Sequence, residues 1–269
     1  MTIETRRSFV VTALTAIVLA VIGGSVGAQQ PGREYQAPRA PGGKPSLEGI
    51  WQVRNTANDD LQDHAGSLGI AAGLGVIVDP ADGSIPYRPE ALAKREQNRA
   101  RRETDDPVAK CYIAGVPRTM YLPHPLQIFQ TPEEVVILSE FVHTTRWVPV
   151  VPLARIDGYE SWIGDSRGRW EGDTLVIETV GFNDSTWFDH SGDYHSDRLK
   201  VTERLRRISD DTLSYEAVID DSQVFTRPWK IRMPLYLHKD RDRLLENECH
   251  LYAEDAGRPI VGTHPEVKP

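Results

Sequence analysis

The chain lacks the residues and motifs of several common cofactor sites. Only two cysteines occur in 269 residues, and two cysteines alone cannot complete a four-ligand zinc site. The sequence contains no dinucleotide-binding fingerprint and no Cys-x-x-Cys-His haem-attachment motif, which argues against nucleotide, flavin and haem sites. Its formal charge is −8 and it has no long basic run, so nucleic acid and anionic lipid are poor partners.

Long apolar runs are also scarce, and the one near the N-terminus is shorter than the roughly 20 residues of a membrane-spanning helix. Arg6 and Arg7 precede this run, which ends in the small residues Val26-Gly27-Ala28. This pattern predicts a twin-arginine export signal over residues 1–28, cleaved after Ala28. An ordinary secretory signal and an uncleaved anchor are the alternatives. We therefore expect a periplasmic or secreted protein with no stable membrane insertion after cleavage.

The remaining sequence divides by composition. Residues 29–46 are rich in Gln, Pro and Gly and predict a disordered or extended lead-in. Residues 47–269 predict a single β-rich domain, because barrels and sandwiches reach this length as one domain. The first strand is expected at Leu47–Val53 and one helix at Glu90–Arg102, with Pro89 at its start. The rest of residues 54–125 is expected to form long loops.

After Pro107 the pattern changes to a period of two, which predicts a strand. In this strand one set of positions alternates with the other: Val135, Ile137, Ser139, Phe141 and His143 with Val136, Leu138, Glu140 and Val142. Three hairpin signals follow, with strands at 167–170 and 174–180, at 199–208 and 212–219, and at 229–237 and 243–252. Short strands with close turns predict a mainly β fold, an antiparallel meander that closes into a barrel. A β-sandwich is the alternative.

The two cysteines, Cys111 and Cys249, lie far apart in the sequence. In an oxidising compartment a single pair most simply forms one disulfide. That bond would close a loop of more than 130 residues and add on the order of 3–5 kcal/mol of stability. Two buried free thiols are the alternative.

Strand phasing identifies candidate buried polar groups. In residues 199–208 one face carries Leu199, Val201 and Leu205 together with Glu203. A carboxylate on an apolar face must be paired, hydrogen-bonded or shifted in pKa. His143 shares its parity with the apolar positions of the preceding strand and is expected to point inward. The two side chains could form a general acid–base pair, and a structural hydrogen bond or an arginine ion pair in the core is the alternative.

The segment 183–197 is the densest polar and aromatic stretch of the chain. It joins two predicted strands, so we expect it over one end of the barrel, where ligands enter. Asn183, Asp184 and Trp187 are candidate ligand-binding residues, and His195 is a candidate second proton carrier. A divalent metal held by His143, His190 and His195 is an alternative to a cofactor-free site, although the spacing matches no standard motif.

From Asp106 onward the chain resembles a family of uncharacterised exported bacterial proteins. The resemblance rests on Asp106–Cys111, Gly115–Arg118, Gln127–Pro132, Glu140–His143, Gly168–Leu175, Gly181–Asp184 with Thr186-Trp187, His195–Asp197, Val201–Arg204 and Thr226–Trp229. Cys111 and Cys249 both fall in stretches typical of that family, which favours the disulfide. The resemblance implies no established activity.

A second resemblance, to lipocalin-like (calycin) barrels, rests on Gly49-Ile50-Trp51 in the first predicted strand and the meander that follows. The long segment 54–125 departs from a compact lipocalin. By analogy the chain would form a calycin-type barrel with insertions, and such an analogy does not fix function.

The leading hypothesis is a periplasmic enzyme that uses acid–base chemistry in the mouth of the barrel. His143, Glu203 and His195 would be catalytic, and the reaction would be hydrolysis, elimination or isomerisation of a hydrophobic or aromatic compound. The ligand-binding residues would be Arg146, Trp162, Asn183, Asp184 and Trp187. A non-catalytic, lipocalin-like binder of apolar small molecules is the first alternative, and a metal-dependent hydrolase is the second.

Overall fold

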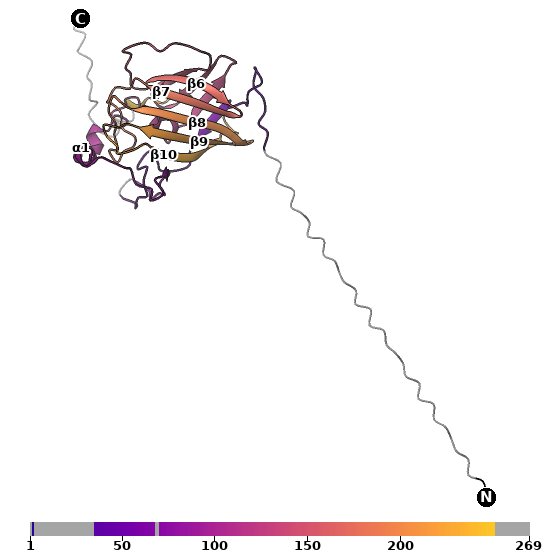
Figure 1. The fold of residues 1–269 in the computed structure, drawn as a ribbon, viewed down its shortest axis with the longest axis horizontal. Helices are drawn as coiled ribbons and strands as arrows, with labels where there is room; N and C mark the ends of the chain where they lie inside the picture. The colour runs from indigo at the N-terminus through magenta and orange to yellow at the C-terminus, as the bar shows by residue number, and fades with distance from the viewer. Residues whose placement is uncertain (1, 3–34, 68–69, 251–269) are drawn as a thin grey trace. The chain divides into compact units, whose positions relative to one another are not determined.

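The chain forms an antiparallel β-barrel that is nearly closed (Figure 1). The computed structural model describes Thr2, residues 35–67 and residues 70–250. Apart from Thr2, the predicted export signal lies outside these described residues. The strands of the barrel are β1 (Gly49–Gln52), β3 (Leu126–Gln130), β4 (Glu134–Ser139), β5 (Thr145–Pro149), β6 (Asp165–Glu171), β7 (Thr174–Val180), β8 (Lys200–Ser209), β9 (Thr212–Asp220) and β10 (Trp229–Leu237). The short strand β2 (Ile77–Asp79) pairs with β10 beside this ring.

Neighbours in the barrel follow the order of the chain. The strands β3, β4 and β5 form one meander, and β6 to β10 form another. Strand β1 joins the two, because Trp51 lies opposite Leu126 on β3 and opposite Leu237 on β10. The predicted meander and barrel are therefore confirmed.

Strands β5 and β6 end the hydrogen-bonded sheet and face each other across a junction without backbone ladder bonds, which we call the seam. A side-chain hydrogen bond and a glycine bring the two strands close together at the seam. Arg146 Nε on β5 donates to Ser166 Oγ on β6 at 3.0 Å. A Cβ atom at Gly168 would lie 3.0 Å from Val148 Cγ1, so the missing side chain lets β6 approach β5 closely.

Side chains fill the interior of the barrel. On β8 the prediction of which side chains point inward is confirmed. Val201, Glu203 and Leu205 are fully buried, whereas Lys200 and Arg206 are exposed. Large fully buried side chains include Trp51 and Trp229. Each apolar side chain of Val or Leu size contributes about 1.5–3 kcal/mol when fully buried, so the alternating strands account for the core.

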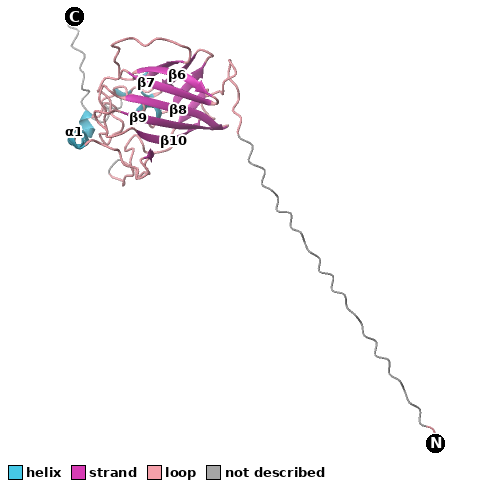
Figure 2. Cartoon of the chain, in the orientation of Figure 1, coloured by secondary structure: helices cyan, strands magenta, loops and turns pink. Residues whose placement is uncertain are grey.

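Helix α1 and the loops around it lie at one end of the barrel (Figure 2). The predicted helix is α1 (Pro89–Ala100), which begins at its proline, and a second short helix, α2 (Arg102–Asp105), follows. The α1 residues Ala91, Arg95 and Asn98, spaced three to four apart, are buried. Short 3-10 turns occur at η1 (Arg118–Met120) and η2 (Phe141–His143). None of the helices in the described ranges is long and apolar enough to span a lipid bilayer.

Over residues 35–46 the lead-in is extended, with one turn, and is not disordered. This segment is ordered because its side chains bind the turns of two hairpins. Tyr35 donates to Asp210 at 2.9 Å, and Arg39 forms an ion pair with Asp173 at 2.8 Å. Residues 29–34 lie outside the described residues.

The third predicted hairpin is wrong, because the described residues 243–250 form no strand after β10. Both edges of β10 are already occupied, by β9 on one side and by β1 and β2 on the other. Side chains hold this segment instead, since Leu245 N donates to Glu140 Oε2 at 2.8 Å. The predicted disulfide is confirmed: it joins Cys111 to Cys249 across 138 residues.

Candidate functional site

The buried carboxylate predicted on β8 is paired with an arginine across the barrel. Arg146 Nη1 donates to Glu203 Oε1 at 3.0 Å, and Nη2 donates to Oε2. Tyr215 OH also donates to Glu203 Oε1, at 2.9 Å. Burial and the negative charge of Glu203 raise the pKa of Tyr215 well above its ordinary value, so the phenol stays a donor. Glu203 therefore forms an ion pair with an arginine in the core, which was the alternative to the acid–base pair with His143.

Hydroxyl groups complete this network on the side of the seam. Arg146 Nη2 donates to Thr179 Oγ1 at 2.8 Å, and Thr179 Oγ1 lies 3.1 Å from Ser166 Oγ. Four of the five guanidinium N–H groups therefore bind Glu203, Thr179 and Ser166. The network fixes Arg146 at the seam with its charge balanced by Glu203.

The prediction that His143 points into the barrel is wrong. Strand β4 ends at Ser139, and the chain then turns through η2, where Val142 and His143 have φ angles of 44° and 51°. This turn interrupts the period-two alternation, so the parity of the strand does not extend to His143. The side chain is 54% exposed, and its Nε2 lies 3.3 Å from Glu248 Oε1. His143 and Glu203 therefore do not form the predicted pair.

His195 is buried and both of its ring nitrogens are engaged. Nδ1 lies 2.8 Å from the carbonyl of Ser196, so it carries the proton, and Nε2 accepts from Thr186 Oγ1 at 2.7 Å. Burial lowers the pKa of His195, and the ring packs against Phe182 and Phe188. Its contacts are those of a neutral, structural histidine.

Three of the other predicted ligand residues, Asn183, Asp184 and Trp187, lie in the β7–β8 loop, residues 181–199. Asp184 is exposed, and Asn183 Oδ1 accepts from the backbone of Ser185. Trp187 is half-buried against the core. Trp162, outside this loop, packs against Tyr112 with ring centroids 5.4 Å apart. Of the predicted ligand-binding and catalytic residues, Arg146 alone lines the pocket at the seam.

That pocket has a volume of about 450 Å³ and lies between β5, β6 and the seam loop, residues 150–164. It is lined by Thr145, Arg146, Trp147, Leu153, Ala154, Ile156, Tyr159, Ile163, Gly164, Asp165, Ser166 and Arg167. Several of its apolar side chains face solvent, and Ile156 is 70% exposed. Arg146 and Ser166 are buried, so they form the floor. We call this hollow the seam pocket.

Arginines hold the seam loop in place. Arg167 Nε donates to the carbonyl of Leu153 at 3.0 Å, and its Nη2 donates to that of Ala154 at 2.8 Å. Arg155 Nη2 donates to the carbonyl of Glu178 on β7 at 3.0 Å. These bonds hold residues 153–155 of the seam loop against β6 and β7.

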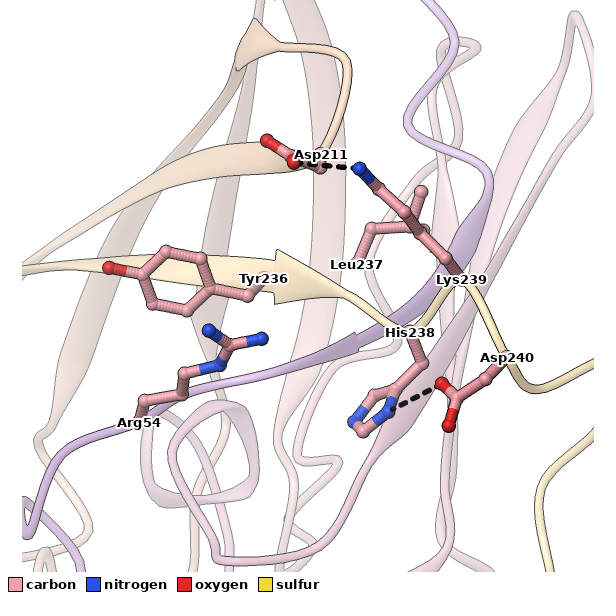
Figure 3. Close-up of a pocket in the computed structure, with 7 residues that line it drawn as sticks. All are labelled: Arg54, Asp211, Tyr236, Leu237, His238, Lys239 and Asp240. Carbon is pink, nitrogen blue, oxygen red and sulfur yellow. Dashed lines mark hydrogen bonds and ion pairs between the residues drawn. The ribbon is translucent and has the colours of Figure 1, made fainter.

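A second pocket, also of about 450 Å³, lies beyond the end of β10 (Figure 3). It is polar, and its charged groups interact with one another. Lys239 binds Asp211 at 2.9 Å, and the Arg54 guanidinium lies 4.6 Å from the centroid of the Tyr236 ring. Because Lys239 and Asp240 are also exposed, this hollow resembles ordinary solvated surface more than an apolar ligand site.

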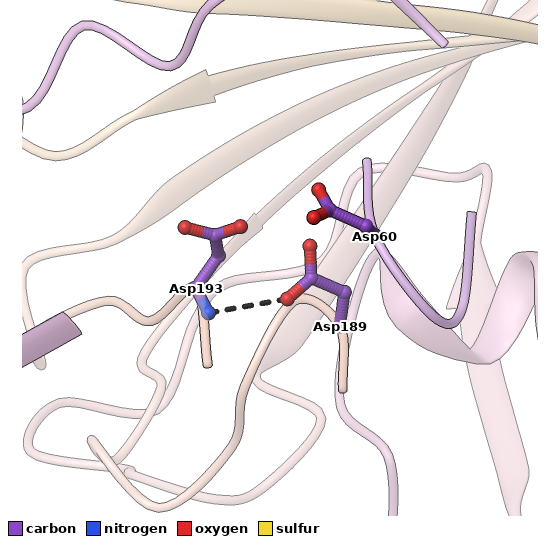
Figure 4. Close-up of side chains that lie close together, drawn as sticks. All are labelled: Asp60, Asp189 and Asp193. Carbon is purple, nitrogen blue, oxygen red and sulfur yellow. Dashed lines mark hydrogen bonds between the residues drawn. The ribbon is translucent and has the colours of Figure 1, made fainter. Parts of the chain in front are cut away.

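The alternative metal set of His143, His190 and His195 does not converge. His190 Nδ1 lies 2.8 Å from Asp106 Oδ2, and the hydrogen bond to Asp106 raises the pKa of His190. Within the described ranges a single group of three or more potential ligands has its ligand atoms within 4.8 Å of one another, and it contains no histidine. Its members are Asp60, Asp189 and Asp193 (Figure 4).

Known proteins give no further guidance to the site: no family model, no curated protein and no solved structure matches the chain. The assignment therefore depends on geometry.

Neither the seam pocket nor the group of three aspartates, which we call the acidic cluster, was predicted from the sequence. The seam pocket had a weak signal, since Ile156 and Tyr159 are apolar residues in a segment between strands where polar residues are usual. The acidic cluster had none, because Asp60 lies about 130 residues before its partners in the sequence. Only the fold brings it beside Asp189 and Asp193.

Proposed function

We propose that the protein binds a small apolar or aromatic molecule in the seam pocket. The observation that carries this proposal is an apolar hollow with a buried polar floor, at the one barrel junction without ladder bonds. Its volume of about 450 Å³ falls within the range of about 300–1,000 Å³ that is usual for ligand pockets.

The floor supports recognition of a neutral polar group. Glu203 balances the charge of Arg146, so the pocket offers no net positive charge to an anion. The remaining N–H of Arg146, on Nη1, and the hydroxyl of Ser166 are the polar groups at the bottom. A ligand with an apolar body and one hydrogen-bond acceptor, such as a carbonyl, fits this arrangement.

The residues around the pocket favour binding over acid–base catalysis. No histidine lines it, and arginine stays protonated in proteins. Asp165, the one carboxylate of the lining, is paired with Arg167 and Arg155. Binding is thus better supported than an enzyme based on His143, Glu203 and His195, or than a hydrolase based on histidine-bound metal. The Cys111–Cys249 bond is compatible with the oxidising compartment that the export signal predicts.

The test uses 6-propionyl-2-dimethylaminonaphthalene, a neutral aromatic ketone whose fluorescence rises in apolar surroundings. We expect saturable binding at one site per chain. The variant Ile156→Asp should weaken binding at least about tenfold, because loss of about 1.4 kcal/mol of apolar contact has that effect.

The matched control is Leu74→Asp, since Leu74 is 82% exposed and outside the pocket lining. It should bind the fluorophore as the parent protein does. Equal affinity of the Ile156→Asp variant and the parent would contradict the proposal, and so would an absence of saturable binding.

A further inference from the structure

Three buried aspartates converge away from the seam pocket, beneath the β7–β8 loop (Figure 4). Asp189 and Asp193 come from this loop, and Asp60 comes from the segment between β1 and β2. Asp189 and Asp193 are fully buried, and Asp60 is 8% exposed. Such burial is costly for three like charges unless something compensates them.

Hydrogen bonds position the carboxylates. Asp189 accepts from the backbone N–H of Leu61 at 3.0 Å and from that of Asp193 at 3.1 Å. Asp60 accepts from the backbone of Gln62 at 2.9 Å and from Ser191 Oγ at 3.0 Å. These donors suit ionised carboxylates, because each one favours the charged form.

Protein cations do not balance the cluster. Arg95 Nε donates to Asp193 Oδ1 at 3.1 Å and supplies one positive charge, which it shares with Glu96. Arg118 lies nearby, but it is engaged by both oxygens of Asp106, at 2.7 and 2.9 Å. When all three carboxylates are ionised, the one bonded cation, Arg95, leaves two negative charges, which one divalent cation would neutralise.

One carboxylate oxygen is left without a partner. Asp193 Oδ1 accepts from Tyr87 OH as well as from Arg95. By contrast, Asp193 Oδ2 is buried and has no hydrogen-bond partner anywhere in the described part of the chain. Figure 4 shows the Asp193 carboxylate beside those of Asp60 and Asp189. The oxygen without a partner therefore belongs to a carboxylate of the acidic cluster. Buried polar atoms without a partner are rare and point to a missing ion or water.

The donors are all oxygen, which selects a hard cation over zinc or copper. Two oxygens on opposite sides of a calcium ion, with bonds of about 2.4 Å, lie about 4.8 Å apart, and the three carboxylates supply ligand atoms within 4.8 Å of one another. The adjoining hollow, lined by Asp60, Ser191 and His190, has a volume of about 70 Å³, room for about two waters. Calcium fits better than magnesium, which keeps several waters.

We propose that Asp60, Asp189 and Asp193 bind one Ca²⁺ ion. The ion joins the segment before β2 to the β7–β8 loop, and Arg95 connects the same cluster to α1.

The experiment is calorimetric titration of CaCl₂ into the full protein after dialysis against EGTA, together with thermal unfolding. We expect one Ca²⁺ per chain. The unfolding midpoint should rise by about 5 °C or more at a hundredfold excess of Ca²⁺ over Kd. Asp193→Asn should weaken binding at least tenfold and remove the calcium-dependent rise in midpoint, whereas Asp197→Asn, an exposed position in the same loop, should do neither.

If Asp193→Asn does not fold, Asp60→Asn serves in its place, because that side chain lies at the edge of the cluster beside the small hollow. No calcium binding by the parent protein would overturn the proposal. Unchanged calcium affinity in the aspartate variant would do so as well. A variant that is more thermostable than the parent in both EGTA and CaCl₂ would also overturn it, because the cluster would then hold a shared proton in place of an ion.

Discussion

Replacing Glu203 by glutamine should test whether the buried ion pair holds the seam together. The carboxylate accepts hydrogen bonds from Arg146 and Tyr215, and both partners are buried with it. Glutamine keeps the size of the side chain but leaves the Arg146 charge without compensation. Breaking one side of a buried pair typically costs about 3–5 kcal/mol, and we expect a loss near 3 kcal/mol because one amide oxygen can still accept.

The double variant Arg146→Met with Glu203→Leu separates charge from packing. It removes both charges, and the Ser166 and Thr179 hydroxyls remain within 3.1 Å of each other. Replacing a buried pair by apolar residues is often neutral or stabilising, but the buried Tyr215 hydroxyl then loses its acceptor at a cost of about 1–3 kcal/mol. The double variant should therefore be more stable than Glu203→Gln by about 1 kcal/mol.

The assay is urea unfolding at neutral pH, with Glu178→Gln as the control. Glu178 pairs with Arg169 on the outside of the barrel at 2.8 Å, where such a pair is worth about 0–1 kcal/mol. A Glu203→Gln variant that loses less than about 1 kcal/mol would refute the reasoning, because it would mean that water reaches the pair through the seam.

Two further predictions concern the hydrogen bond between His190 and Asp106 and the disulfide. The hydrogen bond to Asp106 raises the pKa of His190, so its protonated form stabilises the fold fully below the ordinary pKa of about 6.5, and this contribution is lost as the pH rises through the folded pKa. His190→Gln should therefore lower the urea midpoint more at about pH 5.5 than at about pH 8.5, and equal losses would contradict the assignment. Opening the Cys111–Cys249 loop of 138 residues with Cys249→Ser should cost about 3–5 kcal/mol, and dithiothreitol should reproduce that loss in the parent protein but not in the variant.

Local sequence signals predicted most of the barrel. The hairpins β6–β7 and β8–β9 depend on short-range alternation and on turns such as Glu171-Gly172-Asp173, so residue order alone locates them. The same alternation placed Glu203 inside. It failed for His143, because a two-residue turn with positive φ follows β4 and no residue in it is a glycine that would mark the turn.

The sites were less accessible to sequence reasoning because their members meet only through closure of the fold. Arg146 was identified as a polar ligand residue, but its pairing with Glu203 crosses 57 residues. The segment after β10 was predicted as a strand from its composition, although β10 has no free edge to pair with it. Pairing partners, unlike strand positions, are set by which edges remain available.

The closure of the ring by β1 and β10 also constrains how the chain can fold. Trp51 lies in the first strand of the barrel and Leu237 in the last, yet they are opposite each other. During synthesis β1 leaves the ribosome first, and its β10 edge stays unpaired until the final strand has been made. The two meanders can form early from local contacts, whereas the ring closes only afterwards, at the entropic cost of a very long loop. A chain truncated before Trp229 would therefore expose the free edges of β1 and β9, and open edges favour aggregation.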